Sequence, residues 1–373
     1  MRAPLLSGLL LCLLPVVACA EPPERTPRDF SAEQVRLILQ HGPWPLPWQP
    51  DRSNRVSGNA AAADLGRRLF FDARLSPSGR VSCSSCHRPE RAWTDGRPQG
   101  RGLMPGRRNT PGLADVRLVR WFGWGGAGDS LWGQSLRPLL DPIEMGASAE
   151  HVQAYLGASP ELAGAYTAVF GRAPGAADTQ ATLVDAAKAL AAYQETIVSA
   201  RTRFDELRDA LARADWTSAA RYPPEARRGL ALFIGQAGCS TCHAGPAFTT
   251  GGFAAAGRTG GRSGVEPDQG RREGIATLLA SPFNQAGRFN DDPARRVGWD
   301  AAELMRQQQR PGAPQFRVPG LRNVMRTAPY MHDGALATIN DVLGEHPAGG
   351  PRLSRTETAD LIAFLATLSP PPR

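Results

Sequence analysis

The chain has 373 residues, which is enough for two domains with separate hydrophobic cores. Lys and Arg number 43 against 35 Asp and Glu, for a formal net charge of +8, and Gly (40) and Pro (33) are plentiful. This composition is too varied for a disordered or fibrous chain and indicates many loops. Because the Arg residues are scattered and do not alternate with aromatic residues, the sequence does not favour a nucleic-acid partner. The charge suits an acidic protein partner or an anionic membrane, although a solvated basic surface is the simpler interpretation.

The first twenty residues, MRAPLLSGLLLCLLPVVACA, have the pattern of a secretory signal peptide. One Arg precedes an apolar run that ends in small residues. Cleavage after Ala20 would release a free protein, whereas VVAC also resembles a lipobox, which would place a lipid anchor on Cys19. The Pro-rich, charged residues that follow suit a tether. We therefore expect a signal peptide over 1–20, a tether and helix over 21–57, and a periplasmic protein that is either free or held to the membrane by a lipid.

Helical patterns outnumber strand patterns along the chain. Ser31 and Gln34 have the spacing of a capping box, as do Ser354 and Glu357. The segment over 179–200 is the longest and most amphipathic. Gly- and Pro-rich loops separate the helical segments, and no convincing alternating strand is present, so the sequence predicts an all-α protein with loop-rich connections. The predicted helices cover residues 31–40, 60–72, 159–170, 179–200, 223–236 and 354–368.

Four cysteines follow the signal region, and they form two Cys-x-x-Cys-His motifs. In each half, a helical segment with a Leu-Phe pair near its end precedes the motif, and a short loop with an aromatic residue and Thr follows it. This coarse internal repeat predicts two similar domains, over 58–210 and 211–373. The two motifs comprise Cys83, Cys86 and His87, and Cys239, Cys242 and His243.

These motifs allow several kinds of chemistry. In an exported protein a Cys-x-x-Cys pair could form a disulfide, and two pairs could together bind one zinc ion. Neither interpretation needs a His directly after both pairs. Cys-x-x-Cys-His is the attachment pattern of haem c, in which both thiols form thioethers and the His binds the iron. Two covalent haem c groups are therefore favoured, with disulfides or zinc as the alternatives. Two haems alone fit either an electron carrier or an enzyme.

Four segments together resemble the bacterial di-haem cytochrome c peroxidase superfamily: LGRRLFFDARLSPSGRVSCSSCHRPERAWTDG, RRNTPGLADV, SLWGQSLRPLLDPIEMG and FRVPGLRNVMRTAPYMHDGALATINDV. The resemblance runs from about Gly58 to the C-terminus and implies two cytochrome c-like haem domains. That superfamily includes respiratory peroxidases and MauG-like enzymes, which oxidise residues of another protein. The segment FGWGGAGDSLWGQSLRPLLDP is most similar to the MbnH-type branch, whose members act on a tryptophan of a partner protein.

The resemblance implies that peroxide binds at the N-terminal haem. Glu144 matches a Glu that moves a proton during cleavage of the O–O bond, a step that needs such a group on chemical grounds. Gln134 and Pro138 match residues of the same pocket, and Trp124 matches a Trp that relays electrons between the haems. A surface carboxylate, a helix-surface amide, a turn proline and a packing Trp are the alternatives. This chain has Trp-Gly-Gly-Ala at 124–127, where the peroxidases have Trp-Asp-Gly-Arg, and the difference favours the MbnH-type branch.

The resemblance also implies a Ca²⁺ ion between the haems, bound by the Asn109 side chain and the backbone carbonyls of Thr327 and Pro329. At the C-terminal haem, the family has a second axial ligand fourteen residues after the His of YMHDG. Respiratory peroxidases have Met there and MauG-like enzymes have Tyr, whereas this chain has His346. We hypothesise that His346 binds this iron, with a loop His that has no ligand role as the alternative. The N-terminal half offers only Met104, which we expect to pack, so we expect that iron to be open to peroxide.

The sequence therefore predicts a hydrogen peroxide-dependent di-haem c oxidoreductase of the MauG/MbnH type. We expect it to oxidise a residue of a periplasmic partner protein, a tryptophan, through high-valent haem iron. The alternative is a cytochrome c peroxidase that reduces hydrogen peroxide with electrons from a small cytochrome or cupredoxin. A third interpretation, from a different class, is a di-haem electron carrier without catalytic activity.

Overall fold

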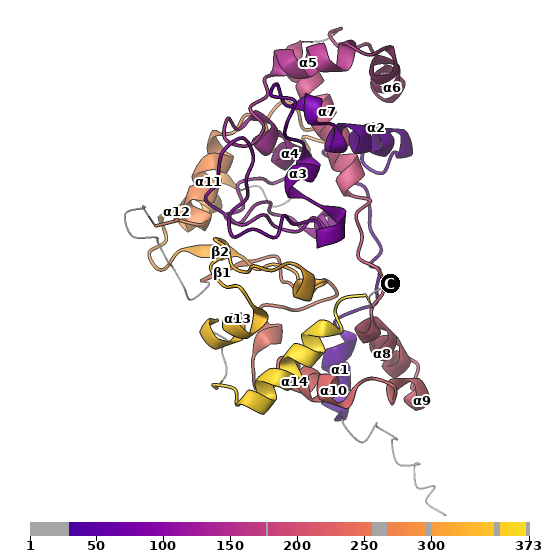
Figure 1. The fold of residues 1–373 in the computed structure, drawn as a ribbon, viewed down its shortest axis with the longest axis vertical. Helices are drawn as coiled ribbons and strands as arrows, with labels where there is room; N and C mark the ends of the chain where they lie inside the picture. Colours follow the sequence, from indigo (N-terminus) through magenta and orange to yellow (C-terminus); the bar gives the residue numbers. More distant parts are fainter. Residues whose placement is uncertain (1–29, 177, 256–266, 295–299, 347–350, 371–373) are drawn as a thin grey trace, which may run out of the picture.

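The computed structural model describes residues 30–176, 178–255, 267–294, 300–346 and 351–370. The predicted signal peptide, with Cys19 and the cleavage site after Ala20, lies outside these residues. Within them the protein is mostly helical, as predicted, with one two-stranded sheet. Helices gather toward the two ends of an elongated molecule, with loops between them (Figure 1). No helix in the described part of the chain is long and apolar enough to cross a membrane.

The first helical group surrounds one buried helix. It comprises α2 (Ala60–Phe71), α3 (Cys83–Cys86), α4 (Leu131–Leu140), α5 (Ala149–Gly157), α6 (Pro160–Phe170) and α7 (Thr179–Gln194). Twelve of the 16 residues of α7 are buried, because α2, α4 and α5 pack around it; the prediction of an amphipathic helix was therefore wrong. The helix also ends at Gln194 rather than at 200. There the chain turns, and Glu195 accepts hydrogen bonds from Ser57 Oγ and Gly58 N.

The second helical group packs α10 against α14. It comprises α1 (Ala32–Leu39), α8 (Arg203–Ala212), α9 (Trp216–Ala219), α10 (Pro224–Ile234), α13 (Ile339–Glu345) and α14 (Arg355–Ala366). Although α1 precedes the first group in sequence, it lies here, beside α8 and α10 (Figure 1). Both predicted capping boxes are present, at Ser31–Gln34 and at Ser354–Glu357. All six predicted helices exist, with ends that differ by one or two residues except at α7.

A glycine allows two helices to cross at close range in each group. A Cβ atom on Gly66 of α2 would lie 1.9 Å from the carbonyl oxygen of Ala189 in α7. A Cβ atom on Gly229 of α10 would likewise lie 1.9 Å from the carbonyl oxygen of Asp360 in α14. Each glycine stands three residues before a Leu-Phe pair. The internal repeat in the sequence therefore marks the same kind of helix crossing in both halves.

Two hydrophobic clusters form the main cores. The first draws on residues from Val56 to Ile197, and the second on α1 and on residues from Phe204 to Leu368. The chain thus passes from one core to the other between Ile197 and Phe204. The division into haem domains at 210/211 stays a prediction.

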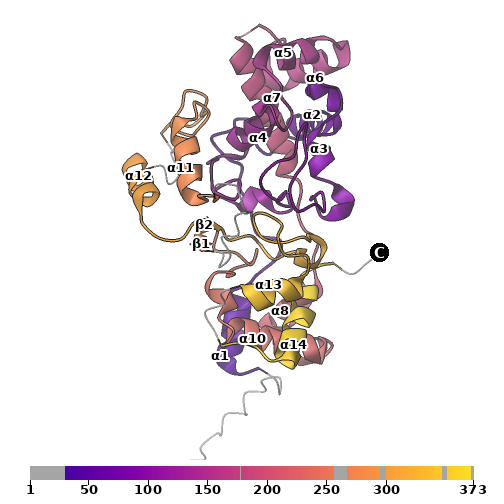
Figure 2. The ribbon, with the colours of Figure 1, turned by 60° about the vertical axis from the view of Figure 1, so that its left-hand side comes forward.

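The two strands and two further helices lie between and beside these groups. Strands β1 (Phe253–Ala255) and β2 (Gln315–Arg317) pair antiparallel, with Ala254 opposite Phe316. Neither was predicted, because three residues are too few to show alternation. Helices α11 (Arg271–Ala280) and α12 (Ala301–Gln309) pack on each other at one side of the molecule (Figure 2). Short 3₁₀ helices are η1 (Ala73–Leu75), η2 (Pro89–Arg91), η3 (Val116–Leu118), η4 (Cys239–Thr241) and η5 (Val324–Arg326).

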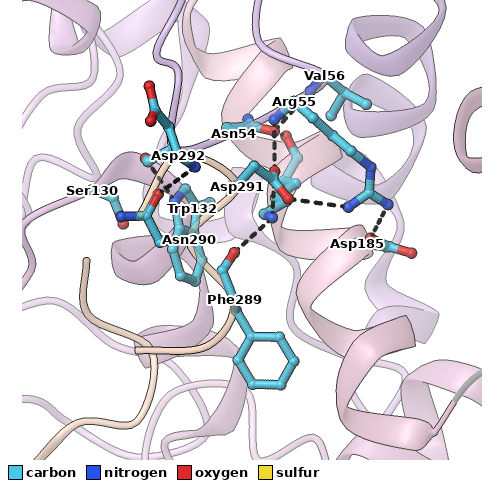
Figure 3. Close-up of polar contacts among 12 residues, drawn as sticks. Asn54, Arg55, Val56, Ser130, Trp132, Asp185, Phe289, Asn290, Asp291 and Asp292 are labelled. Carbon is cyan, nitrogen blue, oxygen red and sulfur yellow. Dashed lines mark hydrogen bonds and ion pairs between the residues drawn. The ribbon is translucent and has the colours of Figure 1, made fainter. Parts of the chain in front are cut away.

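A buried polar network ties the loop after α11 to the first core (Figure 3). Lys188 of α7 is 2% exposed, and its Nζ lies 2.6 Å from Asp291 Oδ2 and 2.8 Å from the carbonyl oxygen of Phe289. Arg55 donates to Asp185 at 2.9 Å and to Asp291 at 3.3 Å. A buried ammonium without its carboxylate would carry an uncompensated charge. Asp291 is therefore the residue on which this attachment depends.

We predict that Asp291→Ala lowers the free energy of unfolding by about 3 kcal/mol or more, because it leaves Lys188 buried and unpaired. Thermal or denaturant unfolding of the purified protein measures this loss. Asp292→Ala is the matched control, since Asp292 is the next residue and pairs at 3.3 Å with Arg52, which is 67% exposed. Its loss should cost less than about 1 kcal/mol. Equal stability of the two variants would contradict the role of the buried pair.

Candidate functional site

A cavity of about 330 Å³ lies beside the first Cys-x-x-Cys-His motif. It is enclosed by α3, α4 and the loops around them. The predicted site residues that line it are Cys83, Cys86, His87, Asn109, Trp124, Gln134, Pro138 and Glu144. The fold therefore gathers the residues expected at the peroxide site around one space, although they are spread over some sixty positions of the sequence.

His87 is oriented by a hydrogen bond to the backbone. Its Nδ1 lies 3.0 Å from the carbonyl oxygen of Trp93. Trp93 has φ +64°, a left-handed conformation that is unusual for a bulky residue. Because a carbonyl can only accept, Nδ1 carries the proton and Nε2 keeps its lone pair for a metal. Burial lowers the pKa of His87, so the ring is neutral, as a metal ligand must be.

A second cavity, of about 280 Å³, repeats this arrangement beside the second motif. The Nδ1 of His243 lies 3.1 Å from the carbonyl oxygen of Phe248, which has φ +55°. Burial lowers the pKa of His243 to about 4. Cys242 lines this cavity, whereas Cys239 packs at the edge of the second core.

His346 lines the same cavity as His243. The two ring centres are 6.3 Å apart, and the ring planes are at 90°. Two imidazoles bound through Nε2 to one metal, each at about 2 Å, would have ring centres about 6 Å apart. The Nδ1 of His346 is buried without a hydrogen-bond partner, and burial lowers the pKa of the ring. Both rings are thus neutral and stand at the spacing that a shared metal ion would require.

The two cavities share a wall, and Trp124 forms part of it. Its indole Nε1 donates to the carbonyl oxygen of Asn109 at 2.8 Å, and its own carbonyl accepts from the backbone N–H of Arg317 at 2.8 Å. These bonds fix both the ring and the backbone of Trp124 between the two motifs. The residues that line both cavities are Asn109, Thr110, Pro111, Gly112, Val116, Val119, Trp124 and Arg317.

Helix α4 and the turn after it position the remaining polar groups. Gln134 and Pro138 lie one helical turn apart and share a face of α4. Asp141 ends the helix, and its carbonyl accepts from the backbone N–H of Glu144 at 3.0 Å. The chain therefore turns back and returns Glu144 to the cavity that the helix lines.

The Glu144 carboxyl has a raised pKa. Desolvation in the cavity raises it most, Asp141 raises it further, and the positive charge of Arg137 lowers it. The side chain is still accessible from the cavity. A carboxyl that holds its proton to a higher pH than a free glutamate is suited to accept and return protons near neutral pH.

Comparison with known proteins agrees with this geometry. The family described as di-haem cytochrome c peroxidase matches residues 60–211. The methylamine utilization protein MauG of Methylorubrum extorquens is 34% identical over 322 residues, which cover 83% of this chain and 78% of that protein. The chain belongs to the di-haem cytochrome c peroxidase family. Cytochrome-c peroxidase IdrP1 of Denitromonas iodatirespirans is 32% identical, over 87% of this chain and 85% of its own.

Solved structures of this family show the same fold. A MauG-like protein associated with microbial copper homeostasis is 29% identical with a TM-score of 0.63, over 88% of this chain and 96% of its own. The di-haem peroxidase BthA of Burkholderia thailandensis is 25% identical with a TM-score of 0.64, over 87% of each chain. The protein is therefore an oxidoreductase of the di-haem peroxidase type. Membership of this enzyme family argues against the electron carrier without catalytic activity.

A di-haem peroxidase has two haem c groups, and the residues present fit them. Each cavity has motif cysteines in or beside it and a neutral His whose Nδ1 is fixed by a carbonyl. Burial raises the pKa of the Cys83 thiol to about 12 and that of Cys86 to about 11, so both are neutral thiols rather than thiolate ligands. His332 and His346 also line the second cavity, and each has a buried Nδ1 without a hydrogen-bond partner. Each is a buried polar atom that a group bound in this cavity can satisfy.

The alternatives from cysteine chemistry do not fit. The two cysteine pairs belong to different cavities, and the described residues contain no group of three or more His, Cys, Asp or Glu side chains that could hold a metal ion. The two pairs therefore do not meet in a four-ligand zinc site. All four thiols in the described chain are free of disulfide bonds.

The first cavity of this di-haem protein has a single histidine among the described residues that line it, which is His87. Met104, the alternative ligand from the sequence, is 58% exposed at the rim. The expectation that it packs was wrong, because its loop lies along the turn after α4, where the Met104 N–H donates to the carbonyl oxygen of Ile143. A methionine that the sequence did not single out, Met145, also lines the cavity but belongs to the first core.

The structure explains the small residues that follow Trp124. Gly126 has φ +69°. A Cβ atom at this position would lie 2.5 Å from Nη1 of Arg271 and 2.4 Å from the Phe253 ring. Arg271 comes from α11 and donates to the carbonyl oxygen of Gly126 at 3.0 Å. A buried arginine from a distant segment thus occupies this side of the site. Sequence reasoning missed it because nothing near Trp124 indicates which segment packs there.

The three predicted calcium ligands line the second cavity together. Asn109 donates through Nδ2 to the carbonyl oxygen of Arg97 at 2.8 Å, which leaves its amide oxygen available. Thr327 and Pro329, whose backbone carbonyls are the other predicted ligands, come from the loop before His332. The set of oxygen donors is of the kind that calcium prefers, and the calcium site stays a prediction.

We predict that His346→Ala removes the low-spin signal of one haem from the ferric protein, because it takes away the imidazole whose ring centre lies 6.3 Å from that of His243. Electron paramagnetic resonance and near-infrared spectra measure this change. His151→Ala is the matched control, since His151 binds the carbonyl oxygen of Arg74 and lines neither cavity. Unchanged spectra of the His346 variant would show that this residue is not an iron ligand.

Proposed function

We propose that the protein reacts with hydrogen peroxide at the first cavity and uses the oxidising equivalents to oxidise a tryptophan of a partner protein. The observation that carries this proposal is the asymmetry of two cavities with one common wall. The first has His87 on its own, with Glu144 and Gln134 nearby, and the second has His243 paired with His346. One site is therefore arranged to receive a small oxidant, and the other is closed by a second imidazole.

The chain offers covalent and metal-binding groups for both haem c groups. Cys83 and Cys86 would attach the first, and His87 would bind its iron. The other pair would attach the second, whose iron both histidines named below would bind. When bound, these groups supply the electrons that peroxide takes up. The attaching and ligating residues of the second are Cys239, Cys242, His243 and His346.

Glu144 and Gln134 are the polar residues that act on peroxide in the first cavity. The Glu144 carboxylate takes a proton from one oxygen of peroxide and delivers it to the other, so that water can leave. The Gln134 amide lies on the α4 face beside it and orients the bound peroxide. Pro138 has no backbone N–H, so α4 lacks the helical bond to the carbonyl oxygen of Gln134, and the proline shapes the helix where it lines the cavity.

Trp124 provides an oxidisable indole in the wall that the two cavities share. Its ring is held by Asn109, and it can pass an electron from the second site toward the first. The oxidising equivalents then reach the His243 side, from which we propose that the partner is oxidised. The Ca²⁺ ion, with ligands from Asn109, Thr327 and Pro329, would hold the same wall in place.

Two observations favour oxidation of a partner protein over peroxide removal. MauG proteins and a MauG-like protein associated with microbial copper homeostasis are among the similar proteins. The Trp-Gly-Gly-Ala sequence, with Arg271 packed on it, also departs from the peroxidase pattern at the inter-haem wall. The similar cytochrome-c peroxidases support the second candidate, in which a small cytochrome or cupredoxin donates electrons to peroxide. We place both activities in the periplasm, with the chain either cleaved after Ala20 or lipid-anchored at Cys19.

We predict that the holoprotein and hydrogen peroxide will together add oxygen to, or remove hydrogen from, a tryptophan of its partner. The experiment mixes holoprotein and peroxide with the product of the neighbouring gene, and in parallel with reduced cytochrome c. Peptide mass spectrometry locates the modified residue, and absorbance follows the cytochrome. Fast cytochrome oxidation without modification of the partner would contradict the leading proposal and favour the peroxidase.

Glu144→Gln should slow the reaction of the ferric protein with peroxide by about 10²- to 10⁴-fold, because no base remains to move the proton. Stopped-flow absorbance at varied peroxide concentration measures this rate. In the unmodified protein the rate should fall as pH drops through the pKa of Glu144, and this fall should occur at higher pH than for a free glutamate, since the pKa is raised. Glu150→Gln, at an exposed position of α5, is the control and should keep the original rate and profile.

A further inference from the structure

Arg137 lines the first cavity together with Gln134 and Glu144. It follows Gln134 by three positions on α4, so the two side chains project from one face of the helix. Its Nη1 donates to Oε1 of Gln134 at 3.3 Å. Gly123, which has φ +72°, leaves room for this contact, because a Cβ atom there would lie 3.3 Å from the same nitrogen. The guanidinium is therefore built into the cavity wall rather than directed to the outer surface.

The positive charge of Arg137 is incompletely compensated. Its hydrogen bond goes to a neutral amide, and although Glu144 is the carboxylate that acts on it most strongly, the two form no direct ion pair in the described structure. Arg108 lines the same cavity but is neutralised by Asp268 at 2.6 Å and by Glu273 at 3.1 Å. A half-buried guanidinium with spare N–H donors, lining the same cavity as a base, attracts an anion into that cavity.

We propose that Arg137 stabilises the negative charge that forms on peroxide in the first cavity. This inference rests on the proposed function and deepens it. Hydrogen peroxide transfers one proton to the Glu144 carboxylate and becomes the hydroperoxide anion, HOO⁻, while the carboxylate becomes a neutral acid. No electron moves in this step. The guanidinium donates hydrogen bonds to the anion, and Gln134 holds the guanidinium in the required place.

This role differs from those of Gln134 and Glu144. Glu144 moves a proton, whereas Arg137 keeps its own and supplies fixed positive charge where negative charge develops. A preorganised donor in a partly dry cavity stabilises an anion far more than a donor in water does. A guanidinium in this position could instead pair with a carboxylate of the haem, and the test below is chosen to separate the two roles.

The test measures anion binding to the resting protein and does not depend on turnover. Fluoride is titrated into the ferric holoprotein and followed by absorbance, with the unmodified protein and R137L compared. We expect R137L to bind fluoride about 10- to 100-fold more weakly, which is the value of a charge-assisted hydrogen bond. R137K, which keeps the charge but not the planar donors, should fall between them. Imidazole, a neutral ligand, should lose no affinity in R137L.

R101Q is the matched control. Arg101 also lines the first cavity but is exposed, so this variant removes one positive charge from the rim and should change fluoride affinity by less than about twofold, since solvent screens the charge. The haem content and thermal unfolding of each variant show that it is folded, and R137Q replaces R137L if the latter is not.

Fluoride affinity of R137L within twofold of the unmodified protein would overturn the inference and point to a structural or haem-carboxylate role. An equal loss of fluoride and imidazole affinity would also overturn it, since that result indicates a changed cavity. If R137L behaves as the unmodified protein while E144Q still reacts slowly with peroxide, this inference alone fails. If the unmodified protein binds neither ligand, the open first iron, and with it the proposed function, fails instead.

Discussion

The hydrogen bond from a histidine Nδ1 to a backbone carbonyl is the interaction on which both halves of the molecule depend. It sets the tautomer of His87 and of His243 and directs each Nε2 to its cavity. In each half the carbonyl belongs to an aromatic residue in a left-handed conformation, Trp93 or Phe248. Such a conformation is costly and persists only where packing holds it. The aromatic ring supplies that packing, because a small residue at either position would have no side chain to anchor the strained turn in the core.

The Leu-Phe helix that precedes each motif is the support for this turn. The phenyl ring of Phe70 packs edge-on against Trp93 at 6.1 Å between ring centres, and in the second half Phe233 packs against Phe248 at 5.9 Å. The same helices carry the glycines that cross close to α7 and α14. The internal repeat is thus a structural unit with the same order of contacts in both halves. The close helix crossing positions a phenylalanine, and this phenylalanine packs against the left-handed residue whose carbonyl binds the histidine. In the second half the ring of His41, from the segment after α1, also stacks on Phe248, so the N-terminal segment helps to hold this turn in place.

The sequence predicted the parts of this protein that are local. The capping boxes, the six helices and the His that follows each cysteine pair depend on short segments, so they can be predicted without a structure. Contacts between distant segments cannot be predicted in this way. The contacts of Arg271 with the Trp124 loop span about 145 positions, and α4 was missed because Pro138 lies inside it and reads as a helix end. The separation of His243 and His346 is an intermediate case: family spacing suggested the pair, and only the fold could give their distance.

The positions of the arginines show that not all of the positive net charge lies on the outer surface. A solvated basic surface accounts for many of them, but several are buried or half-buried around the two cavities. Arg322 is 6% exposed and is paired with Asp205. Arg271 and Arg317 instead make hydrogen bonds to backbone carbonyls. Burial lowers the pKa of Arg271 and that of Arg317 to about 10. Burial of a guanidinium that has no carboxylate partner is unfavourable unless an anionic group completes the site. Arg317 lines both cavities, so anionic groups bound in either would stabilise it. Part of the positive excess therefore acts inside the protein, as a preorganised field for the negative charges that its haem groups and peroxide bring.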